Sequence, residues 1–279
     1  LVGNDEPGDW LEGLLRNAEV ETCRLKRHPA LGTSFTDVMS QHGLERTFFT
    51  YSGANAALGP ENVPLDALRP GILHAGYILL LDAMDAPDAE YGTALARVLA
   101  GARERGIWTS VDAVSEQGER HKTKVPPALR HADFCVLNET EAEKTTGVPL
   151  RDAGGRLLWG NMEDACGALR AMGVHRWAVV HAPEGAFAVD GQGRFRRKPS
   201  LRLPPDAIAG KTGAGDAFAA GVLLGALREY DLEDALALGC CASAARILRP
   251  GRGGGLRPVK ELEGLEREYG WRAPEGEAV

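Results

Sequence analysis

Short apolar runs alternate with amphipathic segments along most of this chain, which is the pattern of strands separated by helices. The expected strands lie at 72–81, 107–114, 132–137 and 175–181, and the expected helices at about 89–105, 161–172, 215–229, 232–248 and 259–269. Strands joined by helices predict a mainly parallel sheet that is covered by helices on both faces. The expected fold class is therefore α/β.

A different pattern precedes the first of these strands. Residues 33–40 and 45–51 alternate apolar and polar positions around the turn-prone Gln41-His42-Gly43, which predicts a half-exposed β-hairpin. Further upstream, Leu1 to Asp5 have the pattern of a strand end, and Gly8-Asp9 is the expected cap of a helix over 10–18. The chain has no repeat or long linker, so we expect one α/β unit that carries a small β flap.

Composition limits the partners of the protein. The 279 residues carry 32 Lys and Arg against 39 Asp and Glu, a formal charge of −7, so there is no general basic field for nucleic acid or an anionic membrane. No apolar run approaches the roughly 20 residues that span a bilayer. The five cysteines are odd in number and lack Cys-x-x-Cys spacing, which indicates reduced thiols and a cytoplasmic location.

The strongest candidate for chemistry is the segment 210–218, Gly-Lys-Thr-Gly-Ala-Gly-Asp-Ala-Phe, which opens a helical run. Gly213 and Gly215 let the backbone approach an anion, and the free amides of a helix start attract negative charge. Asp216 stands at the same point, where its carboxylate could accept a proton from an attacking hydroxyl. These features suit transfer of a phosphoryl group. The same residues also fit a tight turn in which Asp216 caps the helix.

Two further loops follow expected strands, at the sheet edge where parallel sheets bind ligands. Asp112 lies near the end of the run at 107–114 and suits contact with a sugar or Mg²⁺, and it equally suits the capping of a turn. Asn138 and Glu141 form an Asn-x-x-Glu pattern, which is typical of a capping box at a helix start. A carboxylate beside a phosphate-binding turn would also hold Mg²⁺ through water.

Taken together, Asn138-Glu139-Thr140-Glu141 and Gly213-Ala214-Gly215-Asp216 resemble the paired signatures of ribokinase-type (PfkB) carbohydrate kinases. Other stretches resemble further motifs of that family in the same order, so the likeness runs nearly from end to end. They are Gly3 to Asp9, Gly43 to Phe48 for the lid strand, His181 to Gly185 for a nucleotide loop, and Arg249 to Gly251 for the turn that closes the adenine pocket.

The resemblance implies a ribokinase-like fold, with a nucleotide- and substrate-binding core over 1–21 and 53–279 and a small β-sheet lid over 22–52. It implies an ATP-dependent kinase that phosphorylates a hydroxyl group of a small sugar, with Asp216 as the general base. The amides of Gly213, Ala214 and Gly215 would form the anion hole. The remaining implied contacts are Asn138 and Glu141 with the ATP phosphates and, through water, with Mg²⁺; Lys211, His181, Gly185, Cys240 and Gly251 with the nucleotide; and Asp112 and Phe48 with the substrate.

The sequence departs from the family pattern at three places. Gly210 and Lys211 stand where the family turn usually opens with Asp-Thr, which leaves open whether a monovalent cation is used. Lys211 would either add positive charge near the phosphates or point into solvent. Cys240 stands where the family often has an Asn near the adenine. The first strand and the Gly-Gly segment have no counterpart before Leu1, so we expect a missing upstream segment, and activity without it stays open.

These departures keep a second hypothesis open, a non-catalytic member of the same fold that binds nucleotide or sugar as a sensor. A third hypothesis retains the kinase chemistry and replaces the sugar with a nucleoside or a vitamin-like alcohol. The sequence does not specify the acceptor, because a few contacts in the lid and the absent segment would select it. The exposed face of the hairpin could also pair with its twin and form a homodimer through the lids.

Overall fold

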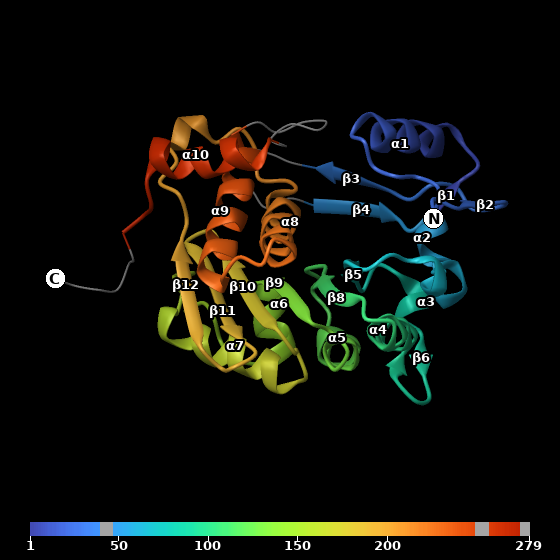
Figure 1. The fold of residues 1–279 in the computed structure, drawn as a ribbon, viewed down its shortest axis with the longest axis horizontal. Coiled ribbons are helices and arrows are strands. Elements are labelled where there is room, and N and C mark those ends of the chain that lie inside the picture. The colour runs from blue at the N-terminus through green and yellow to red at the C-terminus, as the bar shows by residue number, and fades with distance from the viewer. Residues whose placement is uncertain (40–46, 249–256, 274–279) are drawn as a thin grey trace.

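The computed structural model describes residues 1–39, 47–248 and 257–273. In these ranges, six strands form the central sheet, in the order β12-β11-β10-β9-β8-β5 (Figure 1). The parallel strands are β5 (Ile72–Ile78), β8 (Trp108–Ala113), β9 (Phe134–Asn138) and β10 (Trp177–Ala182), and the antiparallel extension is β11 (Gly185–Asp190) and β12 (Phe195–Pro199). The predicted mainly parallel sheet is confirmed, and β11 and β12 add two strands to the four expected ones.

Helices cover both faces of the sheet, as predicted. One face carries α4 (Ala94–Glu104), α5 (His121–Leu129), α6 (Glu139–Thr146) and α7 (Met162–Ala171), and the other carries α8 (Ala214–Leu227) and α9 (Leu232–Leu248), with α10 (Val259–Tyr269) packed on α9. Side chains alternate between the two layers: Leu137 and Val180 join the core under α6 and α7, and Val136 and Val179 join the core under α8 and α9. The apolar runs are continuous because both faces of these strands are buried.

Two glycines set how closely α8 lies against α9. A Cβ on Gly221 would meet the Cα of Gly239 at 2.8 Å, and a Cβ on Gly239 would meet the ring of Phe218 at 2.9 Å. Larger residues at either position would push the helices apart or displace the ring. This close packing fixes the direction of α8, so its first turn reaches the carboxyl ends of the parallel strands.

The predicted hairpin is confirmed in the part of the chain that the structure describes. β3 (Phe35–Met39) pairs antiparallel with β4 (Thr47–Tyr51) as a separate two-stranded sheet, with Thr36 opposite Thr50. The predicted turn Gln41-His42-Gly43 lies outside the described residues. Every residue of both strands is exposed, which is more than the half exposure that the alternation predicts. The exposed large apolar side chains of the hairpin are Phe35, Val38, Met39, Phe48, Phe49 and Tyr51.

The first helix begins earlier than predicted. α1 (Glu6–Asn17) is capped by Asp5, whose Oδ1 accepts the amide of Gly8 at 3.0 Å, so the predicted Gly8-Asp9 cap is wrong. Asp5 Oδ2 also accepts the amide of Thr33 at 2.7 Å. The Asp5 carboxylate therefore caps α1 and also binds the segment that precedes the hairpin. That second contact spans 28 residues, which explains why a local pattern missed it.

The helix expected from residue 89 begins later, at Ala94. Thr93 is its cap, since its hydroxyl accepts the amide of Ala96 at 3.2 Å. The residues before it form a short hairpin instead. The remaining short elements are β1 (Val2–Gly3), β2 (Arg27–His28), β6 (Pro87–Asp88), β7 (Gly92–Thr93), α2 (Gly53–Ala56), α3 (Asp82–Asp85) and 3₁₀ turns at Pro60–Asn62, Leu65–Ala67, Trp159–Asn161 and Pro205–Ala207. Within the described ranges, no helix is both long and apolar enough to cross a bilayer.

Candidate active site

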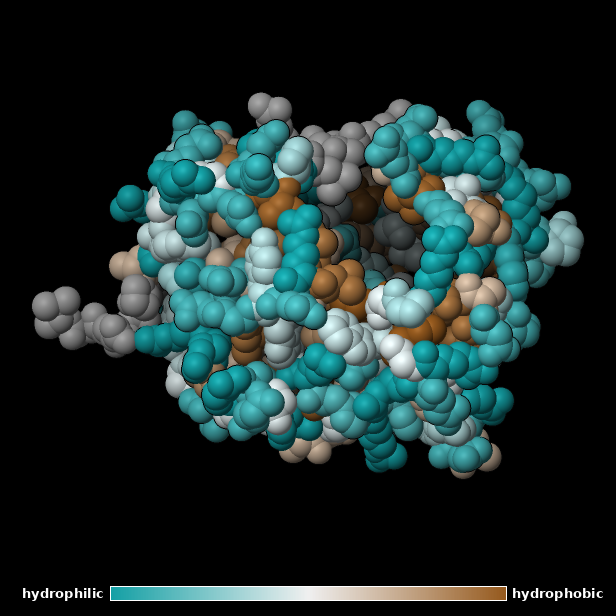
Figure 2. All heavy atoms as spheres, viewed as in Figure 1, coloured by the Kyte–Doolittle hydropathy of each residue, from teal (hydrophilic) through white to brown (hydrophobic). Residues whose placement is uncertain are grey.

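A cleft of about 620 Å³ opens at the carboxyl ends of β5, β8 and β9. Figure 2 shows a hollow in the surface between the lobe that carries α8 to α10 and the lobe that carries α1, with apolar residues along part of its wall. The first turn of α8 forms one side of the cleft, and the hairpin contributes Thr36, Val38, Phe48 and Thr50. The predicted sheet edge and the predicted flap therefore meet at one cavity.

The Gly-rich turn enters this cleft as the N-terminus of α8. Gly213 is the N-cap residue and has φ of 76°, a left-handed conformation that favours glycine. Gly215 lies beside His181, because a Cβ there would be in ordinary van der Waals contact with that ring at 3.4 Å. Asp216 lies in the first turn of α8, is exposed and lines the cleft beside both glycines. Its carboxylate is thus accessible to a ligand.

Tyr77 is a site residue that the sequence patterns did not reveal. It stands near the end of β5, and its phenol donates a hydrogen bond to Oδ1 of Asp216. Burial and the nearby charge of Asp216 raise the pKa of Tyr77, so the phenol keeps its proton and remains a donor. The contact joins residues 139 positions apart, so local spacing carries no signal for it.

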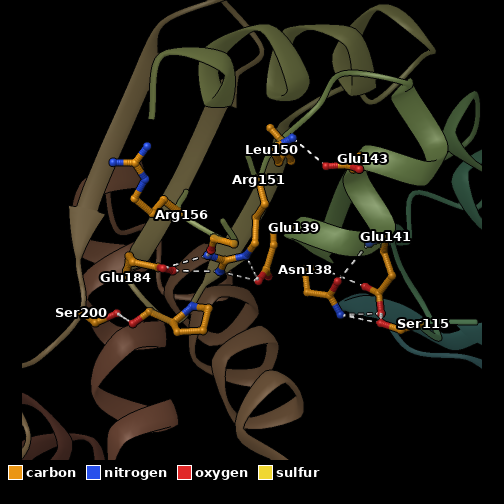
Figure 3. Close-up of polar contacts among 12 residues, drawn as sticks. Ser115, Asn138, Glu139, Glu141, Glu143, Leu150, Arg151, Arg156, Glu184 and Ser200 are labelled. Atoms are coloured by element: carbon orange, nitrogen blue, oxygen red, sulfur yellow. Dashed lines mark hydrogen bonds and ion pairs between the residues drawn. The ribbon is translucent and has the colours of Figure 1, made fainter. Parts of the chain in front are cut away.

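The Asn138–Glu141 pair forms the predicted capping box at the start of α6 (Figure 3). The Oδ1 atom of Asn138 accepts the amide of Glu141 at 3.0 Å, and Oε2 of Glu141 accepts the amide of Asn138 at 2.9 Å. Oε1 of Glu141 accepts hydrogen bonds from Asn138 Nδ2 at 2.6 Å and from the Ser115 hydroxyl at 2.8 Å. Capping and a place in the cleft wall are therefore compatible, because both residues line the cavity.

Two buried carboxyl groups give this wall its oxygen donors. Asp112 is 6% exposed and Glu141 is 4% exposed, and both line the cleft with Asp216. Burial and the negative charge of Glu141 raise the pKa of Asp112, and burial raises the pKa of Glu141. Carboxyl oxygens suit a hard divalent cation. Among the described residues, no cluster of three His, Cys, Asp or Glu could enclose a metal, so these donors fit an ion that keeps water and phosphate ligands.

A second, smaller pocket of about 190 Å³ adjoins the cleft. It lies between the β10–β11 turn, which contributes Gly185, and α9, which contributes Cys240 and Ser243. Its wall is largely apolar, with Leu201, Ile208, Phe218 and Ile247 among the lining residues. A planar apolar group would fit such a pocket better than a charged one.

His181 and Lys211 line both cavities. The His181 ring lies 4.8 Å from the ring of Phe218, between centroids. Burial lowers the pKa of His181 to about 4, so the imidazole is neutral near pH 7. A ligand that crosses from the small pocket into the cleft would pass these two side chains.

The structure thus brings nearly all the predicted site residues to one edge of the sheet. Ala214 is the first residue of α8, between the two lining glycines. Gly251 lies outside the described residues, and its predicted place stays a prediction. The residues in the large cleft are Asp112, Asn138, Glu141, Gly213, Gly215, Asp216 and Phe48; those in the smaller pocket are Gly185 and Cys240; and His181 and Lys211 belong to both.

The sheet, its two helical layers, the separate β-hairpin and the Gly-rich helix start in the cleft define a ribokinase-like α/β protein. The chain belongs to the pfkB family of carbohydrate kinases, because residues 1–257 match that family. The predicted fold and family are confirmed. The predicted enzyme class, an ATP-dependent carbohydrate kinase, is the class that this family defines.

The chain is also similar to individual kinases and to a solved kinase structure. A cytidine kinase of Thermococcus kodakarensis is 33% identical over 111 residues, which cover 40% of this chain and 35% of that enzyme. A 5-dehydro-2-deoxygluconokinase of Shouchella clausii is 23% identical over 283 residues, covering 96% of this chain and 79% of that enzyme. A structure assigned as a ribokinase II of Escherichia coli, with ATP and Mg²⁺ bound, has a TM-score of 0.73 at 18% identity, covering 96% of this chain and 82% of that one. At this identity, the structural likeness establishes the fold.

Proposed function

We propose that the protein transfers a phosphoryl group from ATP to an alcohol group of a small sugar or sugar-like molecule, with Asp216 as the general base. One observation carries the proposal: Asp216 at the start of α8 shares a single cleft with the Asn138–Glu141 loop, and an apolar pocket adjoins that cleft. Charge chemistry and nucleotide recognition therefore have separate, neighbouring places.

Asp216 has one oxygen engaged and one directed toward the Gly-rich turn. Tyr77 donates to Oδ1, and Oδ2 lies 3.6 Å from the position that a Cβ on Gly213 would occupy. We assign Oδ2 as the atom that takes the proton of the acceptor hydroxyl. The amides at Gly213 to Gly215 and the positive end of the α8 dipole then stabilise the negative charge that develops on the transferred group.

The carboxylates of the opposite wall are assigned to the metal side. Bound Mg²⁺ would neutralise charge on the ATP phosphates and so favour their attack by the acceptor. Glu141 is held by Ser115 and Asn138 at hydrogen-bond distance, so its carboxylate is fixed for a water-mediated contact. Asp112 is a further carboxyl group in the same wall. A cation here would also offset the free-energy cost of burying these two carboxyl groups in their ionised form.

The smaller pocket is assigned to the adenine. Its apolar wall suits a planar base, and Cys240 on α9 forms part of that wall where the family often has an Asn. Gly185 has room for no side chain, because a Cβ there would lie 2.7 Å from the carbonyl oxygen of Lys198. Lys211 and His181 then lie between adenine and acceptor, where Lys211 adds positive charge beside the phosphates.

The β3–β4 hairpin is assigned as a lid. Thr36, Val38, Phe48 and Thr50 reach the cleft, while Phe35, Met39 and Phe49 belong to the exposed apolar surface of the hairpin. Closure would exclude water from the phosphoryl group. We keep the division into a core over 1–21 and 53–279 and a lid over 22–52. Pairing of two lids in a homodimer would cover the exposed apolar side chains, and sedimentation velocity tests it.

A nucleoside acceptor is the second candidate. Two aromatic rings, Tyr77 from β5 and Phe48 from the hairpin, line the acceptor side of the cleft, and aromatic walls suit a stacked base. The partial match to a cytidine kinase supports the same substrate class. A sugar acceptor instead agrees with the longer match to a sugar kinase.

An ADP-release assay with pentoses, hexoses, sugar acids and nucleosides tests the proposal. We expect Mg²⁺-dependent ADP formation with one acceptor class and loss of that activity in Asp216→Ala. Calorimetry on the same protein covers the alternative function. ATP binding without ADP formation for any acceptor would favour the non-catalytic sensor, and absence of both would contradict the kinase assignment.

A further inference from the structure

Arg151 lies in a loop between α6 and α7 whose backbone is firmly held. Leu150 is fully buried, and its amide donates to Glu143 Oε2 at 2.6 Å. The amide of Leu158 donates to the carbonyl oxygen of Leu150 at 2.9 Å, and Arg151 forms an isolated antiparallel bridge with Leu157. The loop therefore presents the Arg151 side chain from a fixed position.

The guanidinium of Arg151 joins two carboxylates from different segments (Figure 3). Nη1 and Nη2 donate to Oε1 and Oε2 of Glu184 at 2.9 and 3.0 Å, a bidentate pair. Nε and Nη2 donate to Oε1 of Glu139 at 3.1 and 2.7 Å, and Nη1 also donates to the carbonyl oxygen of Gly155 at 2.9 Å. A guanidinium has five N–H donors, and these contacts use all of them. Arg151 thus has no donor left for a phosphate.

The two carboxylates belong to segments that border different cavities of the candidate site. Glu139 directly follows Asn138 and is the first residue of α6. Glu184 lies in the β10–β11 turn, whose flanking residues Pro183 and Gly185 line the smaller pocket. β9 and β10 are neighbouring strands, with Asn138 opposite His181. The Arg151 contacts therefore connect the cation side of the cleft to the wall of the nucleotide pocket.

We propose that Arg151 is a positioning residue that fixes the β10–β11 turn against the start of α6 and so sets the geometry in which ATP binds. The inference rests on the proposed function, because it takes the smaller pocket as the nucleotide site. The side chains of Arg151, Glu139 and Glu184 are 27%, 15% and 23% exposed, so the ion pairs are partly shielded from water. Shielded, bidentate pairs hold geometry better than exposed single pairs.

The first test compares Arg151→Gln with Arg156→Gln. Arg156 is a matched control, because it lies in the same loop and pairs with Asp152 while its side chain is 86% exposed. We expect Arg151→Gln to raise the ATP dissociation constant, measured by calorimetry, and the KM for ATP by about tenfold, since supporting contacts of a ligand site usually have effects of this size. The KM for the acceptor and the properties of Arg156→Gln should match wild type.

A second set of variants separates geometry from charge. Glu184→Gln should weaken ATP binding in the same direction, and the double variant should lose less than the two single effects combined, because both remove one contact. Arg151→Lys keeps the charge and lacks the planar fork, so it should not restore affinity. Wild-type ATP affinity in both single variants, additive losses, or full restoration by Arg151→Lys would each overturn the proposal.

Amide hydrogen exchange without nucleotide tests the contact independently of the proposed function. In wild type, β11 pairs with both β10 and β12, so peptides that cover 182–190 should exchange slowly. The amide of Ser200 also donates to the carbonyl oxygen of Glu184 at 2.9 Å and ties the turn to the segment after β12. Arg151→Gln should speed exchange in peptides that cover 182–190, with peptides of α5 unchanged. Unchanged exchange in 182–190 would reject the positioning role. If Arg151→Gln speeds this exchange and the wild-type protein does not bind ATP, only the nucleotide assignment is rejected.

Discussion

The two cavities at the carboxyl edge of the sheet differ in what their walls can do. The larger cleft contains four carboxylates, Asp112, Glu116, Glu141 and Asp216. The smaller pocket has a largely apolar wall built on Leu201, Ile208, Phe218 and Ile247. Carboxyl groups at a helix N-terminus suit a reaction that moves a proton and phosphate charge, whereas an apolar wall suits recognition by shape. The fold thus separates chemistry from recognition while keeping both at one edge.

The difference also predicts how substitutions should divide. Changes in the cleft should lower kcat, and changes in the pocket should raise the KM for ATP. His181 and Lys211 line both cavities, so substitutions at these two positions should change both kcat and the KM for ATP. The following substitutions test that division, beginning with the largest expected effect.

Asp216→Ala should lower kcat by about 10³-fold, because it removes the proposed general base. The ATP dissociation constant should stay close to wild type, since Asp216 does not line the smaller pocket. Steady-state kinetics and calorimetry measure the two quantities. Asp206→Ala, an exposed acidic residue ahead of the same turn, is the control and should change neither. Near-normal kcat in Asp216→Ala would remove the assigned base.

Ser243→Leu should raise the KM for ATP by about tenfold with little change in kcat, because the larger side chain fills a pocket of about 190 Å³. Ser243→Ala keeps the pocket open and should behave like wild type. The measurement is initial rate against ATP concentration at saturating acceptor. If Ser243→Leu lowers kcat and leaves the KM for ATP unchanged, the pocket does not hold the nucleotide.

Tyr77→Phe should lower kcat by about threefold, because it removes one hydrogen bond to the Asp216 carboxylate and keeps the ring. The KM for ATP should not change. Tyr91→Phe, on the short β6–β7 hairpin, controls for loss of a phenol elsewhere. An unchanged kcat would show that the phenol does not help to hold the base.

His181→Gln should change the pH dependence of stability. The folded state lowers the pKa of His181 from 6.5 to about 4, so the folded protein binds fewer protons than the unfolded chain between these values. The contribution of His181 to the free energy of unfolding should be fully present above pH 6.5. It should fall by up to about 1.4 kcal/mol per pH unit as the pH drops toward 4. Urea unfolding at pH 7 and pH 5 should show a smaller difference in His181→Gln. An equal difference in both proteins would mean that His181 titrates normally.

Much of the fold and part of the site could be predicted because the relevant signals are local. β8, β9 and β10 are buried on both faces, and their apolar runs therefore stand out from the flanking helices. The Asn138–Glu141 capping box is a contact between residues three positions apart, so its spacing is visible in the sequence. Gly213 could be picked out as well, because its backbone adopts a left-handed conformation that favours glycine.

Other features depend on contacts that spacing cannot show. Tyr77 becomes a site residue only when β5 and the start of α8 come together. The carboxylate of Asp5 also binds the amide of Thr33, 28 positions away, a contact that no local pattern shows. In the sequence, Arg151 does not differ from any other loop arginine. Its role depends on Glu184, which is 33 positions away and contacts it only in the folded chain. Tertiary neighbours decide these roles, and one sequence does not list them.

The exposed apolar side chains of the β3–β4 hairpin have a practical consequence for assays. Environment-sensitive dyes report unfolding by binding apolar surface, and this protein displays Phe35, Met39, Phe48 and Phe49 while folded. A dye-based melting scan should start from high fluorescence, and ligands that cover the hairpin should quench that baseline. Circular dichroism avoids this artefact, and the starting fluorescence itself becomes a convenient optical readout of hairpin coverage.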